Sequence, residues 1–182
     1  MSLDEQLAKA RAGDLAAFGD LVRAHKRSVY SLALRMLGRR DLAEDMAQEV
    51  FMQLHGKLQS IESSAHLAFW LRKVTAHRAI DQLRRRPPVE MTSLDDEAQL
   101  VSTVDGSDPL LQRQLRQLVL NLSPPARAVV MLRYQEDLDP LEIAKTLDMP
   151  INTVKSHLKR SLETMRQEIL GQVETRREGH ST

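Results

Sequence analysis

The hydrophobic positions in the last third of the chain recur every three or four residues and fall into two short runs. Asp139 can accept a hydrogen bond at a helix start, Pro140 suits the first helical position, and Glu142 completes a capping-box pattern. Asp148-Met149-Pro150 then interrupts the period, because proline disfavours helical geometry both at its own position and at the residue before it. This pattern predicts two short helices joined by a tight turn.

The second run predicts an amphipathic helix that Asn152 or Thr153 would cap. Its apolar side, which we expect to face the core, contains Val154, Leu158, Leu162, Met165 and Ile169. Its polar side contains Lys155, Ser156, Lys159 and Glu163. Two cations near the start of such a helix are typical of a helix-turn-helix that meets base edges in the major groove of DNA. The alternative is an ordinary amphipathic helix with a solvated face.

The first third of the chain predicts further helices. Asp14 can cap a segment that runs to Leu37, as two helices or one bent helix, with Gly38 as its stop. Asp41 and Glu44 form a second capping-box pattern. The apolar stripe that follows comprises Met46, Ala47, Val50, Phe51, Leu54 and Leu58, and the opposite face carries Asp45, Gln48, Glu49, Met52 and Gln53. Solubility alone would explain this mostly acidic face, so the pattern does not decide whether it binds a partner.

A third helix is predicted from about residue 65 to residue 86, where Pro87 would end it. Its aromatic and basic members are Phe69, Trp70, Arg72, Lys73, His77, Arg78, Arg84, Arg85 and Arg86. Cations neutralise phosphates and aromatic rings stack on unpaired bases, so this helix could lie along a nucleic acid. Core packing is the alternative for Trp70, and a buried, hydrogen-bonded imidazole is the alternative for His77.

The net charge of +1 is unevenly distributed along the chain. Residues 1–86 hold 15 Lys and Arg against 10 Asp and Glu, residues 87–109 hold none against 6, and residues 110–182 hold 11 against 9. The acidic segment begins with two prolines and shows no helical period, so we interpret it as a flexible linker. Alternating β-branched and aromatic runs are nearly absent. The sequence therefore predicts an all-α protein with two small helical domains.

Composition excludes several classes of function. No apolar run is long enough to span a bilayer and the N-terminus lacks a secretory signal, so we expect a cytoplasmic protein without membrane insertion. The absence of cysteine excludes disulfides and thiolate metal sites. The histidines form no HExxH pair, and neither a Gly-rich phosphate loop nor a nucleophile elbow is present. We expect no catalytic activity, no cofactor and no metal site.

Three blocks of the sequence resemble one protein family. They are DLAEDMAQEVFMQLH at 41–55, AFWLRKVTAHRAIDQLRRR at 68–86 and LSPPARAVVMLRYQEDLDPLEIAKTLDMPINTVKSHLKRS at 122–161. In this order they are similar to the extracytoplasmic-function (ECF, group 4) sigma factors of bacterial RNA polymerase, in the sigma-70 family. The resemblance implies a region 2 helical bundle at 1–86, the linker at 87–109, a region 4 helix-turn-helix domain at 110–172 and a polar tail at 173–182.

The resemblance also implies roles for individual residues. The acidic helix of such proteins docks on the polymerase's largest subunit, which points to Asp41, Glu44, Asp45, Gln48, Glu49 and Met52. The next loop and helix open and hold the promoter's minus-ten element, which points to Ser63, Ser64, His66, Trp70, Lys73, His77, Arg78 and Asp81. The recognition helix reads the minus-thirty-five element with Lys155, Ser156 and Lys159, with Thr153, His157, Arg160 and Arg133 nearer the phosphates.

Three positions depart from the family's usual pattern. Asn152 stands where glycine is frequent, and its side chain could cap the helix or reach a base or phosphate, which would shift promoter preference. His157 stands where arginine is frequent and His77 where asparagine is frequent.

The partners implied by the resemblance are core RNA polymerase, promoter DNA and an anti-sigma factor, in a stress or environmental response. The residues alone leave an alternative, a repressor-type or response-regulator-like protein in which residues 1–86 serve dimerisation or sensing. That alternative predicts specific binding to duplex DNA without polymerase. The sigma-factor interpretation predicts weak binding alone and strong promoter binding together with core enzyme.

Overall fold

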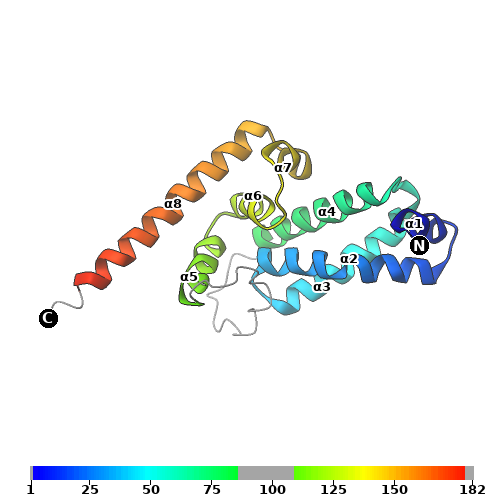
Figure 1. Ribbon diagram of the computed structural model, residues 1–182, viewed down its shortest axis with the longest axis horizontal. Helices are drawn as coiled ribbons and strands as arrows, with labels where there is room; N and C mark the ends of the chain where they lie inside the picture. The colour runs from blue at the N-terminus through cyan, green and yellow to red at the C-terminus, as the bar shows by residue number, and fades with distance from the viewer. Residues whose placement is uncertain (1, 86–108, 179–182) are drawn as a thin grey trace. The chain divides into compact units, whose positions relative to one another are not determined.

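The computed structural model describes residues 2–85 and 109–178, and at 109 and 172–178 it describes only the course of the backbone. Within these ranges the regular structure is helical and no strand occurs, which confirms the predicted all-α class. The helices belong to two compact units, which divide the chain into an N-terminal and a C-terminal part (Figure 1). The predicted acidic linker, apart from Pro109, lies outside the described residues, as do Arg86, Pro87 and residues 179–182.

The first unit consists of α1 (Leu3–Arg11), α2 (Leu15–Leu37), α3 (Arg40–Lys57), the 3-10 helix η1 (Leu58–Ser60) and α4 (Ser64–Arg85). Helix α2 is continuous, with the Asp14 carboxylate accepting from the amides of Ala16 and Ala17 at its start. Gly38 ends it with a φ of 70°, a conformation that costs glycine little because it has no Cβ. Both ends therefore lie where the sequence predicts them, and the single-helix alternative is correct.

The predicted capping box of α3 is wrong. The helix begins at Arg40 with Arg39 at the cap position, and no side chain caps it. The Asp41 carboxylate instead accepts a hydrogen bond from Arg39 Nε at 3.1 Å and pairs with the same guanidinium through Nη2. The Asp41 carboxylate, which the sequence pattern predicts to cap the helix, therefore binds the guanidinium of Arg39 instead.

The core of the first unit forms where α2 packs against α1, α3 and α4. Its fully buried side chains include Leu21, Leu32, Met36, Val50, Leu54, Ile61 and Leu67. Each such side chain contributes roughly 1.5–3 kcal/mol when it leaves water. The apolar stripe predicted for α3 is confirmed at Met46, Ala47, Val50, Leu54 and Leu58, while Phe51 is only half-buried. The opposite side of α3 is left facing solvent.

The second unit consists of α5 (Pro109–Leu120), α6 (Pro124–Tyr134), α7 (Pro140–Leu147) and α8 (Ile151–Glu178). The predicted capping box of α7 is confirmed: Asp139 accepts from the amides of Leu141 and Glu142, and the Glu142 carboxylate accepts from the amide of Asp139. Asp148 ends α7 with a φ of 51°, and Met149 and Pro150 form the tight turn. Helices α7 and α8 are the predicted pair.

Helix α8 differs from its prediction at its start. It begins at Ile151, and the amides of Thr153 and Val154 donate to the carbonyl of Pro150. Asn152 and Thr153 therefore lie within the first turn rather than at the cap position. At its other end the helix continues to Glu178.

The buried face of α8 is also rotated from the predicted stripe. Val154, Ser161 and Met165 are buried, whereas Leu162 is 44% exposed. At about 100° per residue, Ser161 lies within about 20° of Val154 around the helix, and Leu162 lies about 80° away. The predicted stripe includes Leu162 because it is apolar, although geometry favours the serine.

One buried arginine joins α5 to α6. Arg127 is 4% exposed and donates through Nη2 to the carbonyls of Leu120 and Leu122, the latter at 3.4 Å. These carbonyls lie at the end of α5 and just beyond it, where the helix itself provides no partner for its last carbonyls. Burial lowers the pKa of Arg127, because the charged form loses solvation.

Candidate functional site

The polar face of α3 is exposed along its length. The predicted docking residues Asp41, Glu44, Asp45, Gln48, Glu49 and Met52 are all exposed. Met52 is 75% exposed, so this large apolar side chain contributes little to the core. The hydrogen bond from Arg39 lowers the pKa of Asp41, so this carboxylate stays charged. The fold thus places acidic side chains on one exposed surface of α3, with the apolar side chain of Met52 toward the end of the helix.

Arg78 of α4 reaches across to this surface of α3. Its Nε and Nη2 donate to Gln53 Oε1 at 3.1 Å and 3.0 Å, and its Nη1 pairs with the Glu49 carboxylate. The prediction assigns Arg78 to minus-ten DNA, but its guanidinium is engaged with α3 in this structure. Gln53 acquires a structural role that sequence reasoning missed, because its partner is 25 residues away.

The segment before α4 is held by its own side chains. The Ser63 hydroxyl accepts from the amide of His66 at 3.1 Å, which is the contact of a helix cap. His66 Nδ1 accepts from the amide of Glu62 at 3.2 Å. Ile61 is fully buried and anchors the segment, while Ser63, Ser64 and His66 remain partly exposed. The predicted loop residues therefore lie together at the start of α4.

The outer side of α4 carries the remaining minus-ten candidates. Trp70, Lys73 and His77 are half-buried and Asp81 is exposed, whereas Leu67, Leu71, Thr75 and Ala76 face the core. The Lys73 ammonium lies 5.9 Å from the centre of the Phe69 ring, within cation–π range. Trp70 is only partly buried, so core packing does not account for the whole residue, and its contact with DNA stays a prediction.

The start of α8 presents the predicted recognition residues to solvent. Asn152, Thr153, Lys155, Ser156, Lys159 and Arg160 are exposed, and His157 is half-buried. Lys159 lies 4.0 Å from Glu163 one turn further along the helix, which is a weak exposed ion pair. Neither lysine is needed for the core, since Val154 and Met165 occupy the buried side.

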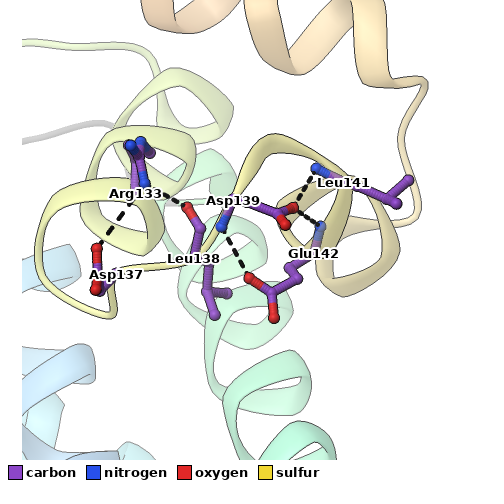
Figure 2. A network of polar contacts seen from close by, with 6 residues as sticks. All are labelled: Arg133, Asp137, Leu138, Asp139, Leu141 and Glu142. Carbon is purple, nitrogen blue, oxygen red and sulfur yellow. Dashed lines mark hydrogen bonds and ion pairs between the residues drawn. The ribbon is translucent and has the colours of Figure 1, made fainter.

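Arg133 at the end of α6 takes part in a network next to α7, which Figure 2 shows. Its Nη1 donates to the carbonyl of Leu138 at 3.1 Å and lies 3.9 Å from the Asp137 carboxylate. Asp137 has a φ of 53°, so Arg133 stabilises a turn that is unfavourable for a non-glycine residue. The residue predicted to contact phosphate therefore also fixes the connection that leads into the capping box of α7.

One small cavity of about 40 Å³ lies between α2 and α4, and His25, Ser28, Arg72 and Thr75 are among its lining residues. Burial lowers the pKa of His25. None of the predicted DNA contacts lines this cavity. In the described part of the chain, no cluster of three or more His, Asp or Glu could hold a metal ion, and no helix has the length and apolar character to cross a membrane.

Comparisons with known proteins give one family match in each of the two units. Residues 21–87 match sigma-70 region 2, and residues 112–165 match sigma-70, region 4. The ECF RNA polymerase sigma factor SigW of Bacillus subtilis is 29% identical over 93% of this chain and 97% of its own length. The ECF RNA polymerase sigma factor SigE of Mycolicibacterium smegmatis is 32% identical over 85% of this chain and 63% of its own length.

Two solved structures share the fold. CnrH, in complex with the cytosolic domain of CnrY, gives a TM-score of 0.68 at 18% identity and covers 93% of this chain and 99% of its own. The sigma factor RpoE of Bartonella quintana, in complex with the anti-sigma factor NepR, gives 0.61 at 19% identity and covers 85% and 96%. The fold and its two matched regions define a two-domain sigma factor. The chain belongs to the ECF sigma factors of the sigma-70 family, which confirms the resemblance seen in the sequence.

Proposed function

We propose that this sigma factor is a non-catalytic specificity subunit that acts in the cytoplasm, where it binds core RNA polymerase and directs it to promoters. The observation that carries the proposal is that the predicted contact residues on α3 and at the start of α8 are exposed and unnecessary for the core. Exposed charges of one sign create a local potential that steers a partner of opposite charge to the surface.

The acidic face of α3 is the proposed polymerase-binding surface. Asp41, Glu44, Asp45 and Glu49 supply negative charge, and Met52 supplies an apolar anchor that would be buried on docking. Complementary charge raises the association rate, and burial of the methionine adds affinity. Family membership supports this assignment.

The minus-ten element is the proposed ligand of the loop before α4 and of the outer side of α4. Ser63, Ser64 and His66 would form the pocket for a base that leaves the stack, and Trp70, Lys73, His77 and Asp81 would line the path of the strand. Arg78 belongs to the same set in the sequence, and its contacts with α3 suggest that it also links the DNA-binding and polymerase-binding surfaces.

The minus-thirty-five element is the proposed ligand of the start of α8. Lys155, Ser156 and Lys159 would reach base edges, while Thr153, His157, Arg160 and Arg133 would lie nearer the phosphates. Asn152, in the first turn, is exposed and free of a capping role, so its amide is available for a base or phosphate.

An anti-sigma factor is the proposed regulator. RpoE of Bartonella quintana was solved with the anti-sigma factor NepR, and CnrH with the cytosolic domain of CnrY. A partner that covers the acidic face of α3 would block polymerase binding directly. The response to stress or environment that the sequence analysis expects would follow from release of such a partner.

Run-off transcription with purified core polymerase tests the proposal. Wild-type protein should yield promoter-specific transcripts, and the double charge reversal Glu44→Lys and Asp45→Lys should abolish them together with retention by polymerase in a pulldown. Glu168→Lys, a charge reversal at another exposed position, on α8, is the control and should retain activity. Retention of the double variant at wild-type strength, or tight operator binding without polymerase, would contradict the proposal.

A further inference from the structure

Helix α1 precedes the part of the chain that matches sigma-70 region 2, which begins at residue 21. The helix is nevertheless well defined. Ser2 and Glu5 form a capping box at its start, and Leu7 and Ala10 are buried against the rest of the first unit. No contact with polymerase or DNA is predicted from the sequence for this segment.

Two hydrogen bonds connect α1 to the segment that leads into α4. Asp4 Oδ1 accepts from the amide of Ser64 at 2.7 Å, across 60 residues of sequence. Gln59 Nε2 donates to the carbonyl of Arg11 at 2.7 Å, across 48 residues. One contact comes from the first turn of α1 and the other from its last residue, so the two together fix the helix against both ends of segment 59–64.

The bond from Ser64 completes the start of α4. The first amides of a helix have no partner within the helix, and side chains from elsewhere satisfy them. Ser63 accepts from the amide of His66, but the amide of Ser64 points to the carboxylate of Asp4. A negative charge at this end also interacts favourably with the helix dipole. Asp4 therefore acts as a cap that one helix supplies to another.

We propose that α1 is a positioning element for the minus-ten loop, with Asp4 and Gln59 as its positioning residues. The inference rests on the proposed role of Ser63, Ser64 and His66 in that loop. A pocket that binds an unstacked base must already have its shape before the base arrives. The residues that line such a pocket are held in place by hydrogen bonds from neighbouring residues that do not contact the base. Asp4 supplies that support from α1, and Gln59 of η1 ties the segment to the last residue of α1, both without touching DNA.

Amide hydrogen exchange in the full chain tests the contact itself, without polymerase. Asp4→Ala should speed exchange of the Ser64 amide by about fivefold, the factor expected when one such hydrogen bond is lost. Asp4→Asn keeps a carbonyl oxygen at the same place and should restore most of the protection. Asp14→Ala is the matched control, because the Asp14 carboxylate caps a helix with the same chemistry but accepts from amides of α2 and not from segment 59–64, and the variant should leave exchange of the Ser64 amide unchanged.

Transcription with core polymerase tests the consequence. The ratio of transcript from an intact promoter to transcript from one with altered minus-ten bases should fall at least about threefold in Asp4→Ala, within the range expected for the loss of one hydrogen bond. The corresponding ratio for the minus-thirty-five element should not change. Asp14→Ala should preserve both ratios, which separates loop positioning from a general loss of stability. Gln59→Ala should reproduce the effect of Asp4→Ala on the minus-ten ratio.

The outcomes are distinguishable. Unchanged Ser64 exchange in Asp4→Ala, or an unchanged minus-ten ratio in a folded variant with faster exchange, overturns the positioning role while the proposed function stands. If wild-type protein gives no promoter-specific transcript, the proposed function fails, and the positioning role in promoter recognition is overturned with it even when Ser64 exchange responds.

Discussion

The contact between Arg78 and α3 yields the sharpest prediction, because two interpretations of this residue differ in their response to one substitution. Arg78 donates to Gln53 Oε1 from two nitrogens, at 3.1 Å and 3.0 Å, and pairs with Glu49 from a third. Only a guanidinium offers three such donors in a fixed plane. Arg78→Lys keeps the positive charge for a phosphate but loses this geometry.

The magnitude follows from exposure. The side chains of Arg78 and Glu49 are 37% and 59% exposed, so solvent screens their ion pair, which contributes about 0.5 kcal/mol. The two partly buried bonds to Gln53 share one acceptor and contribute about 1–1.5 kcal/mol together. We therefore expect Arg78→Ala to lower the free energy of unfolding of the first unit by about 1.5–2 kcal/mol.

Urea unfolding followed by tryptophan fluorescence measures this change, because Trp70 is the only tryptophan and lies in the first unit. A double-mutant cycle should give a coupling of about 1 kcal/mol between Arg78 and Gln53, and less than about 0.5 kcal/mol between Arg78 and Glu49. Salt should weaken the second coupling more than the first. Arg78→Lys should be nearly as destabilising as Arg78→Ala.

The refuting result is equally specific. Additive effects of Arg78→Ala and Gln53→Ala within about 0.3 kcal/mol would show that the contact contributes nothing in solution. Wild-type stability and full transcription in Arg78→Lys would show that Arg78 acts through its charge, as a phosphate contact, and not as the link between α3 and α4.

Four further predictions follow from other parts of the chain. Asp139→Ala should lower the stability of the second unit by about 1 kcal/mol, measured by thermal unfolding, since two amides at the start of α7 lose their acceptor. Met165→Ala should lower the free energy of unfolding of the second unit by about 2 kcal/mol and Leu162→Ala by less than about 1 kcal/mol, because Met165 is 9% exposed and Leu162 is 44% exposed. Equal losses for the two variants in urea unfolding would contradict the observed buried face of α8. Burial lowers the pKa of His25, so as the pH falls the unfolded chain takes up a proton at this imidazole before the folded chain does. The contribution of neutral His25 to the free energy of unfolding is therefore full above the ordinary histidine pKa and is lost as the pH falls through the lowered pKa. His25→Gln should flatten that part of a plot of stability against pH. Lys155→Ala should weaken binding of polymerase holoenzyme to the minus-thirty-five element by about 1–3 kcal/mol in a filter-binding assay, and an effect independent of promoter sequence would show a phosphate contact instead.

Short-range signals in the sequence predicted much of this fold correctly. The capping box of Asp139 and Glu142, the cap at Asp14 and the stop at Gly38 each involve residues within a few positions of one another. Such contacts depend on local backbone geometry, which the residue types largely decide. The all-α class follows from the same kind of evidence, repeated along the chain, whereas the family rests on the resemblance of three sequence blocks.

The errors arose where two local signals compete. Asp41 has the right spacing to Glu44 for a capping box, but its carboxylate instead binds the charged guanidinium of Arg39, two residues away. On α8 the apolar Leu162 fits the three-to-four spacing, yet Ser161 lies nearer the centre of the buried face. A small polar side chain can be buried at a position where the neighbouring helices leave little space.

The contacts that the sequence could not reveal join residues far apart along the chain. Asp4 with Ser64 and Arg78 with Gln53 are separated by 60 and 25 residues, and no periodicity relates their positions. The exposed candidates on α3 and α8 were predictable for the opposite reason, because a polar residue on the far side of an apolar stripe needs no tertiary partner.

The most direct test of the central claim is the dissociation constant for a promoter duplex that carries both elements, measured at one salt concentration with and without core polymerase. The account predicts weak binding by the free chain, with little preference for the promoter, and tight selective binding by the complex with polymerase, lost when either element is scrambled. Tight selective binding by the free chain, unaffected by added polymerase, would contradict it.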